Sequence, residues 1–306
     1  MGRRGTAQFK ETLKAYAFGV AQDTNSAIAE FLAPRVQVGV SAGMFKKFDD
    51  KNAFQIYETA RALGGPATRI EFLATDGTFN CDPQALEVPI DDAERDKAGD
   101  AQQNLEEAKT RTLVVNASIA REHKVVTLVK SGIRAVSGRG NWSDAAVDPV
   151  TEIDEQIEAI ATATGMMPNA MVLGLGAWRI LKNHPLVLKR RPGADIASVG
   201  LSEFAAMLLN PAMQIKVGIL SRDTTKFGKD KSAVNIVGGE VFLFIRSDNP
   251  TQYDPGFAKT FSIGASSVED VYTYRDDKCR SDILAVDWSE DVKVVSTACA
   301  RRIALS

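Results

Sequence analysis

Side chains that could do catalytic chemistry are few in this chain of 306 residues, and their spacing is unfavourable. The sequence has only two histidines, His123 and His184. A catalytic histidine needs an orienting acid and a nucleophile within reach. His184 stands directly before Pro185, where a helix is expected to end, and we interpret it as a polar cap. His123 lies in the charged run 121–124, which indicates a solvated or interface position. We therefore predict no catalytic residue.

Motifs for nucleotides, metals and activated nucleophiles are also missing from the sequence. It contains no GxSxG, HExxH or GxxxxGK[ST] pattern. Gly174 and Gly176 follow an expected strand and open a helix, but Arg179 occupies the third glycine position of a dinucleotide turn. We predict no bound cofactor and no metal ion, and this shifts the interpretation toward a structural or binding role.

The composition is that of a soluble globular protein, with 44% hydrophobic and 25% charged residues. A net charge of -2 argues against a broad phosphate-gripping face. The apolar runs fall far below the ~20 residues that span a bilayer, so no membrane partner is expected. No apolar segment follows the basic start, which predicts no secretory signal. The three cysteines form no CxxC pair and indicate reduced thiols.

The first 45 residues predict an extended arm with little core of its own. Phe9, Leu13, Tyr16 and Val20 recur at helical spacing. A short helix is expected over 25–32, followed by an extended segment. This hydrophobicity is too sparse to form a core, so we expect the arm to need a partner surface.

Residues 44–90 predict a long two-stranded ribbon. The segments 69–72 and 78–82 alternate with a period of two, and Gly64, Gly65 and Pro66 form a strong turn signal. An isolated hairpin is marginal in water. We therefore expect this ribbon to lie against another subunit, with an ordinary surface hairpin as the alternative.

Residues 91–130 carry the clearest helical pattern, and Gly99 is its only weak point. The stripe consists of Ala98, Ala101, Leu105, Ala108, Thr112, Val115, Ile119, Val126 and Val129. A helix of about 38 residues would be ~57 Å long. A helix of this length extends beyond one small core, so we expect it to act as a beam, a rigid support for several parts of the fold. A coiled coil is the alternative, although the stripe is rich in Ala and Thr rather than Leu.

The remainder alternates helices and strands in a compact α/β module that starts near Pro149 and runs to residue 264. Beyond it, strands are expected over 271–275, 283–286 and 292–296. The apolar tail 298–305 is expected to pair back into a sheet beside the long helix, which places the α/β module as an insertion.

This order of elements resembles the tailed-bacteriophage major capsid protein of the HK97-like fold. The text from Ala62 to Asp92 is similar to the family's extended E-loop leading into its spine helix. Residues 141–149 are similar to the entry of its axial domain, and 165–174 with 181–185 to a strand and helix inside that domain. The resemblance spans nearly the whole chain, and the order of the segments is more specific than any one of them.

The resemblance implies an α+β fold in four parts. These are an N-terminal arm (1–43), an E-loop ribbon (44–90), a peripheral P-domain with the spine helix (91–147 and 265–306), and an inserted α/β axial A-domain (148–264). It implies a non-enzymatic shell protein that forms pentamers and hexamers around packaged dsDNA in a virion assembled in the bacterial cytoplasm. Portal and scaffold proteins are implied partners, and cement proteins are further candidates. Because the arm follows Met1 quickly, we expect no N-terminal scaffolding segment.

Within the ribbon, we predict that Arg69, Glu71, Asp76 and Phe79 contact a neighbouring subunit, because the ribbon is too polar to stand alone. The family's lysine crosslink is not expected, since the tip 58–68 contains no lysine. Three alternatives stay open: an encapsulin-like nanocompartment shell, a soluble α/β enzyme with residues 150–264 as its catalytic module, and a tail or head-completion protein.

Overall fold

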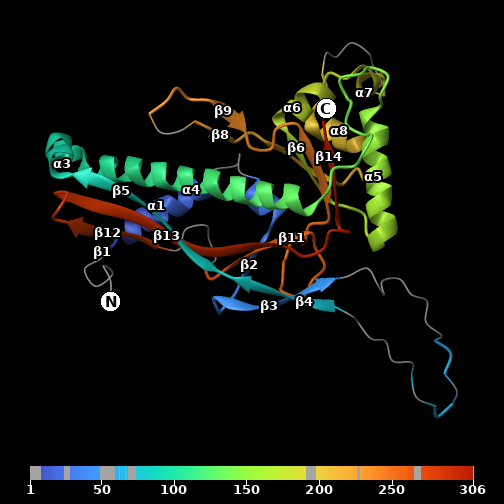
Figure 1. The fold of residues 1–306 in the computed structure, drawn as a ribbon, viewed down its shortest axis with the longest axis horizontal. Helices are drawn as coiled ribbons and strands as arrows, with labels where there is room; N and C mark the ends of the chain where they lie inside the picture. The colour runs from blue at the N-terminus through green and yellow to red at the C-terminus, as the bar shows by residue number, and fades with distance from the viewer. Residues whose placement is uncertain are drawn as a thin grey trace.

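A long helix between two β-sheets organises the molecule in a computed structural model (Figure 1). The structure describes residues 8–23, 28–48, 59–61, 63–65, 67, 74–190, 198–225, 228–264 and 270–305. The helix α4 (Gln102–Gly132) has 31 residues, and is therefore ~46 Å long at ~1.5 Å per residue. The predicted beam is present but divided, because α3 (Asp92–Ala98) ends at Gly99 with φ of 50° and a 3₁₀ turn, Gly99–Ala101, joins it to α4.

The first sheet lies along α4 and has six strands. In order they are β1 (Gln8–Phe9), β12 (Asp270–Asp276), β13 (Ser281–Val294), β11 (Ala258–Ser262) and β2 (Arg35–Gln37), with β5 (Asp82–Asp91) also paired to β13. The prediction of separate strands over 283–286 and 292–296 is wrong, because β13 runs unbroken for 14 residues. The continuous strand was not predicted because residues 287–291 are polar apart from Trp288.

The N-terminal segment packs on its own subunit, which differs from the expectation that it needs a partner surface. The helix α1 (Glu11–Asp23) lies beside α4 and buries Leu13 and Ala17 against α4 and β13. The helix α2 (Ala29–Leu32) contributes to the main core, and β2 pairs in parallel with β11. A few apolar residues suffice here because α4 and the sheet supply the rest of the core.

The second sheet has four strands and forms the largest core. In order they are β14 (Ala300–Ala304), β10 (Glu240–Phe244), β6 (Ala170–Gly174) and β7 (Gln214–Gly218). The helices of this region are α5 (Pro149–Thr164), α6 (Leu175–Leu181), α7 (Pro185–Lys189) and α8 (Leu201–Ala206). Gly174 has a packing role, since a Cβ there would lie 1.9 Å from the carbonyl oxygen of Gly238.

Two strands cross the domain boundaries that the sequence predicted. The tail pairs back into a sheet as expected, but β14 joins β10 in the four-stranded sheet, and β11, placed in 148–264, joins β13 in the six-stranded one. Arg302 ties the tail to the end of α4, because its Nη1 donates to the carbonyl oxygens of Lys130 and Ile133. Both sheets are therefore built from segments distant in the sequence.

Two strand pairs stand apart from these sheets. The strands β3 (Ala42–Phe48) and β4 (Ala74–Asn80) pair with each other and form the base of the predicted ribbon. A second hairpin consists of β8 (Ser221–Asp223) and β9 (Ala233–Asn235). In Figure 1 the two pairs project on opposite sides of α4. Residues 82–90, predicted as part of the ribbon, instead form β5 of the six-stranded sheet.

Candidate assembly surfaces

The base of the ribbon is built from two cross-strand pairs that each oppose a phenylalanine and a glycine. Gly43 faces Phe79, and Phe45 faces Gly77. A Cβ on Gly43 would lie 2.7 Å from Cζ of Phe79, and a Cβ on Gly77 would lie 2.5 Å from Cζ of Phe45. Each glycine therefore leaves the space that the opposite ring occupies.

These two rings attach the ribbon to the six-stranded sheet through Phe261 of β11. The ring centroids of Phe79 and Phe261 lie 4.5 Å apart with an interplanar angle of 12°, and those of Phe45 and Phe261 lie 5.1 Å apart. We call Phe45, Phe79 and Phe261 the aromatic anchor. The surrounding buried residues are Val36, Val38, Cys81 and Val295. Stacked and tilted ring pairs contribute about 0.5–1.5 kcal/mol each beyond the area that they bury.

The structure places the four residues predicted to contact a neighbour in different situations. Phe79 is 2% exposed in the core of its own subunit, so its ring has no free surface for a neighbour, and this part of the prediction is corrected. Asp76 is exposed, and its Oδ1 lies 2.6 Å from Nζ of Lys46 on the facing strand. Arg69 and Glu71 lie outside the described residues.

The other face of the ribbon base remains open. Met44 is 64% exposed, and it pairs with Thr78, which is also exposed. The nearby Val40 is 59% exposed. Large exposed apolar side chains in one region indicate an interaction surface rather than a solvated loop. This face, with Asp76 and Lys46 beside it, is the part of the ribbon that a neighbour could cover.

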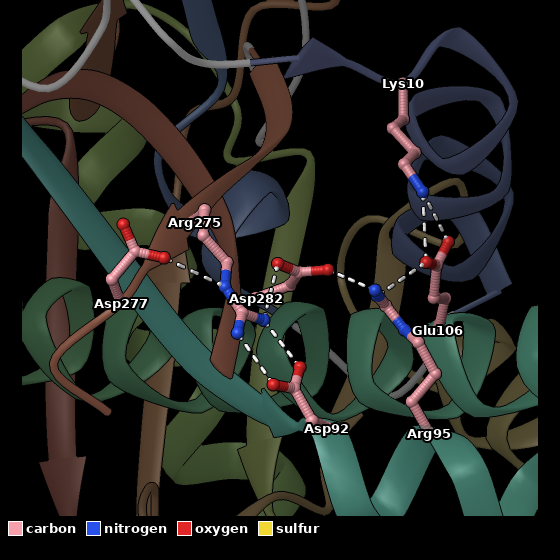
Figure 2. A network of polar contacts seen from close by, with 7 residues as sticks. All are labelled: Lys10, Asp92, Arg95, Glu106, Arg275, Asp277 and Asp282. Atoms are coloured by element: carbon pink, nitrogen blue, oxygen red, sulfur yellow. Dashed lines mark hydrogen bonds and ion pairs between the residues drawn. The ribbon is translucent and has the colours of Figure 1, made fainter. Parts of the chain in front are cut away.

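A network of polar contacts lies at the N-terminal end of α4 (Figure 2). Its members are Lys10, Asp92, Arg95, Glu106, Arg275, Asp277 and Asp282. The guanidinium of Arg275 makes a bidentate pair with Asp92, with distances of 2.5 and 2.7 Å. Hydrogen bonds from Arg275 lower the pKa of the Asp92 carboxyl. Arg95 contacts both Asp282 and Glu106. The network joins Lys10, which directly precedes α1, to α3, α4 and the β12–β13 hairpin at this end.

Buried charges join the middle of α4 to its neighbours. Nε of Arg121 lies 2.9 and 2.8 Å from the two carboxylate oxygens of Glu290, and both side chains are buried. Nη2 of Arg35 lies 3.5 Å from the same carboxylate. On the next residue, Oε2 of Glu122 accepts a hydrogen bond from the backbone N–H of Ile28 at 2.7 Å. Burial raises the pKa of Glu122 to about 7.

Catalytic chemistry finds no support in the described part of the chain. No group of three or more His, Cys, Asp or Glu side chains there could hold a metal ion. His184 is a polar cap as predicted, but it caps the start of α7 rather than the end of the preceding helix, because its Nδ1 accepts from the backbone N–H of Leu186 at 3.3 Å. Among the described helices, none combines the length and apolarity required to cross a membrane.

Two curated proteins are similar to this chain in sequence, whereas no family model matches it. The major capsid protein of Pseudomonas phage JBD67 is 30% identical over 183 residues, which cover 58% of each chain. The major capsid protein of Burkholderia phage BcepMu is 28% identical over 252 residues, which cover 79% of this chain and 80% of the relative. The chain thus spans less than two thirds of the first relative's length.

Solved structures agree with the architecture across almost the whole chain. A phage-related protein from Bordetella bronchiseptica RB50 has a TM-score of 0.75 at 24% identity and covers 97% of both chains. The capsid of the myovirus XM1 has a TM-score of 0.57 at 12% identity, covering 92% of both chains. An encapsulin complex from Synechococcus elongatus PCC 7942 also scores 0.57, at 10% identity and 92% and 87% coverage. These likenesses confirm the predicted resemblance: the chain has the HK97-like fold of phage major capsid proteins.

Proposed function

We propose that this chain is a major capsid protein whose copies assemble into the pentamers and hexamers of an icosahedral shell around packaged phage dsDNA. The observation that carries the proposal is the ribbon base, which is anchored in its own subunit by one face while the other face remains open. A strand pair with one uncovered face, on which the apolar Met44 is exposed beside an ion pair, favours packing against another protein. The sequence similarity to two phage major capsid proteins supports the same role.

The mechanism we propose is self-assembly through several modest contacts. Specific interfaces bury about 1,600 Å² in total, and a closed shell engages each subunit at several such interfaces at once. The net charge of -2 limits repulsion between copies. The structural role without catalytic turnover is proposed from the similarity to phage major capsid proteins. Portal, scaffold and cement proteins stay as proposed partners, and the assembled virion as the proposed location.

The encapsulin-like shell is the second candidate, favoured by the fold likeness to the encapsulin complex. The two candidates predict similar particles but different contents. The phage reading is preferred because the sequence relatives, at 28–30% identity, are phage capsid proteins.

Electron microscopy of the protein purified from expressing cells tests the proposal. We expect curved, closed shells built from rings of subunits. A discrete monomer or small oligomer with a ligand-binding cleft would favour the enzyme alternative. Particles isolated from a lysate of the producing host distinguish the two shells, since packaged dsDNA supports the phage role and a protein cargo supports the nanocompartment.

A further inference from the structure

The second hairpin, defined as residues 221–225 and 228–235 with β8 and β9, is exposed along most of its described length. All three residues of β8 are exposed, as are Ala233 and Val234 of β9 and the described turn residues 228–232. A two-stranded hairpin is at best marginally stable in water unless a third strand or another surface supports it. Within the described chain α4 comes near β8, but it leaves all three residues of β8 exposed.

The hairpin is nevertheless held in a defined shape at its base and turn. Nδ2 of Asn235 donates to the carbonyl oxygens of Gly218 and Ile219, and its Oδ1 accepts from the backbone N–H of Gly238 at 2.8 Å. Oδ1 of Asp223 accepts from the backbone N–H groups of Thr225 and Ser232 at 3.0 and 3.1 Å. A pre-shaped element loses less entropy when it binds.

Its exposed side chains combine apolar groups with unpaired positive charge. Val234 is 48% exposed and pairs with Arg222, so the two side chains share one face. Lys229 and Lys231 are exposed on the turn. Within the described part of the chain, Arg222, Lys229 and Lys231 form no salt bridge. The carboxylate of Asp223 is engaged by the turn, and Asp230 is the other acid of the hairpin.

We infer that the second hairpin is a docking element that seats on an acidic surface of a neighbouring copy of this chain. A second copy offers such a surface: Asp92 and Glu94 pair with Arg275 and Lys109, but Asp91, Asp96 and Asp100 are exposed and form no ion pair within the described part of the chain. A protein partner is favoured over nucleic acid because a phosphate backbone binds the cations but leaves Val234 uncovered.

The position of the hairpin agrees with this partner. It projects on the opposite side of α4 from the ribbon (Figure 1). Rings of identical subunits close through heterologous contacts, in which one edge of a copy meets a different edge of the next. The inference rests on the proposed self-assembly, but it adds a second contact element that is independent of the ribbon.

Charge reversal tests the inference in the full-length protein. Lys229→Glu/Lys231→Glu is compared with Lys124→Glu/Lys189→Glu, which reverses two exposed lysines that lie outside both the hairpin and residues 91–100. We expect the hairpin variant to keep the melting temperature of the wild type and to yield at least about tenfold fewer particles, while the control variant assembles normally. Particles at the wild-type yield from the hairpin variant would overturn the inference.

Zero-length carbodiimide cross-linking of particles made from a mixture of ¹⁴N- and ¹⁵N-labelled protein identifies the partner directly. We expect mixed-isotope peptide pairs that join Lys229 or Lys231 to an Asp or Glu of another copy. Cross-links confined to single-isotope pairs would contradict the inference, as would variant particles that form normally but contain less nucleic acid. If the wild-type protein formed no particles, the proposed function itself would fail; if wild type, control and hairpin variant all assembled, only this inference would fail.

Discussion

The ring of Phe79 stacks on the ring of Phe261, with centroids 4.5 Å apart. Phe79 belongs to the projecting ribbon and Phe261 to the six-stranded sheet, so this contact fixes the ribbon base to the body of its own subunit. The base of the ribbon is therefore packed on the core of its own subunit. What it offers to a neighbour is its opposite face, which carries Met44 and Asp76.

Replacing Phe261 by alanine should remove the shared partner of both ribbon rings. Because Phe261 is fully buried, Phe261→Ala is expected to lower the free energy of unfolding by about 3–5 kcal/mol, measured by urea denaturation. Tyr253→Ala is the control, since Tyr253 is 65% exposed and should change stability by less than about 0.5 kcal/mol. Equal effects of both substitutions would contradict the aromatic anchor.

The glycines facing the rings should not tolerate a methyl group. Gly77→Ala would place a Cβ 2.5 Å from Cζ of Phe45, and overpacking of this kind costs about 1–3 kcal/mol. Gly39→Ala serves as the matched control, because no atom lies within 4 Å of its Cβ position. Thermal unfolding of the two variants checks this, and a Gly77→Ala protein as stable as Gly39→Ala would show that the rings are not constrained.

Buried and exposed ion pairs of the fold should differ strongly in their effect on stability. Glu290→Gln leaves Arg121 buried without its counter-charge, which costs about 3–5 kcal/mol. Asp92→Asn disrupts an exposed pair with Arg275, and its effect on the free energy of unfolding should be much smaller. Urea denaturation of both variants gives the comparison. A larger loss of stability for Asp92→Asn would show that the polar network around Arg275 contributes more to stability than the buried pair does.

Glu122 should make stability depend on pH. Burial raises its pKa from the ordinary 4.5 to about 7, so the folded protein binds this proton more tightly than the unfolded chain does. The stabilisation that this provides is complete below about pH 4.5 and is lost as the pH rises through about 7. The free energy of unfolding should therefore fall over this window relative to the Glu122→Gln variant.

An exposed glutamate provides the control for this pH profile. Glu158 is exposed, so Glu158→Gln should follow the wild-type profile between about pH 4.5 and pH 7. A Glu122→Gln protein whose stability falls in parallel with the wild type would rule out Glu122 as the responsible group.

Local signals in the sequence were sufficient to predict where single helices begin and end. Helix α5 begins after Asp148, whose side chain accepts from the backbone N–H of Val150, and it ends at Gly165 with φ of 68°. Both ends are encoded locally, because capping depends on residues within one turn. The break at Gly99 follows the same logic, since this was the only weak point of the long helical stripe.

The arrangement of the sheets depends on contacts between distant segments, and it was predicted less well. No residue pattern within β11 or β14 indicates that β11 pairs in the six-stranded sheet and β14 in the four-stranded sheet. Phe79 shows the same limit at the level of one residue. A period of two separates the two faces of a strand, but it does not tell which face meets the subunit's own core. The charged hairpin at 221–235 was predicted only as part of the α/β module, because its exposure follows from how it leaves the sheet.

Electron microscopy of a variant that lacks residues 49–73, the outer part of the predicted ribbon, tests the central claim most directly. Residues 49–73 are replaced by an Asn-Gly turn, which suits a two-residue hairpin and preserves the pairing of Phe48 with Ala74. This change retains Phe79, which a deletion of 54–79 would remove from the core. We predict closed shells from the wild type and only folded, soluble monomers or capsomers from the variant. Complete shells from the variant, or a wild-type protein that stays a monomer, would contradict the account.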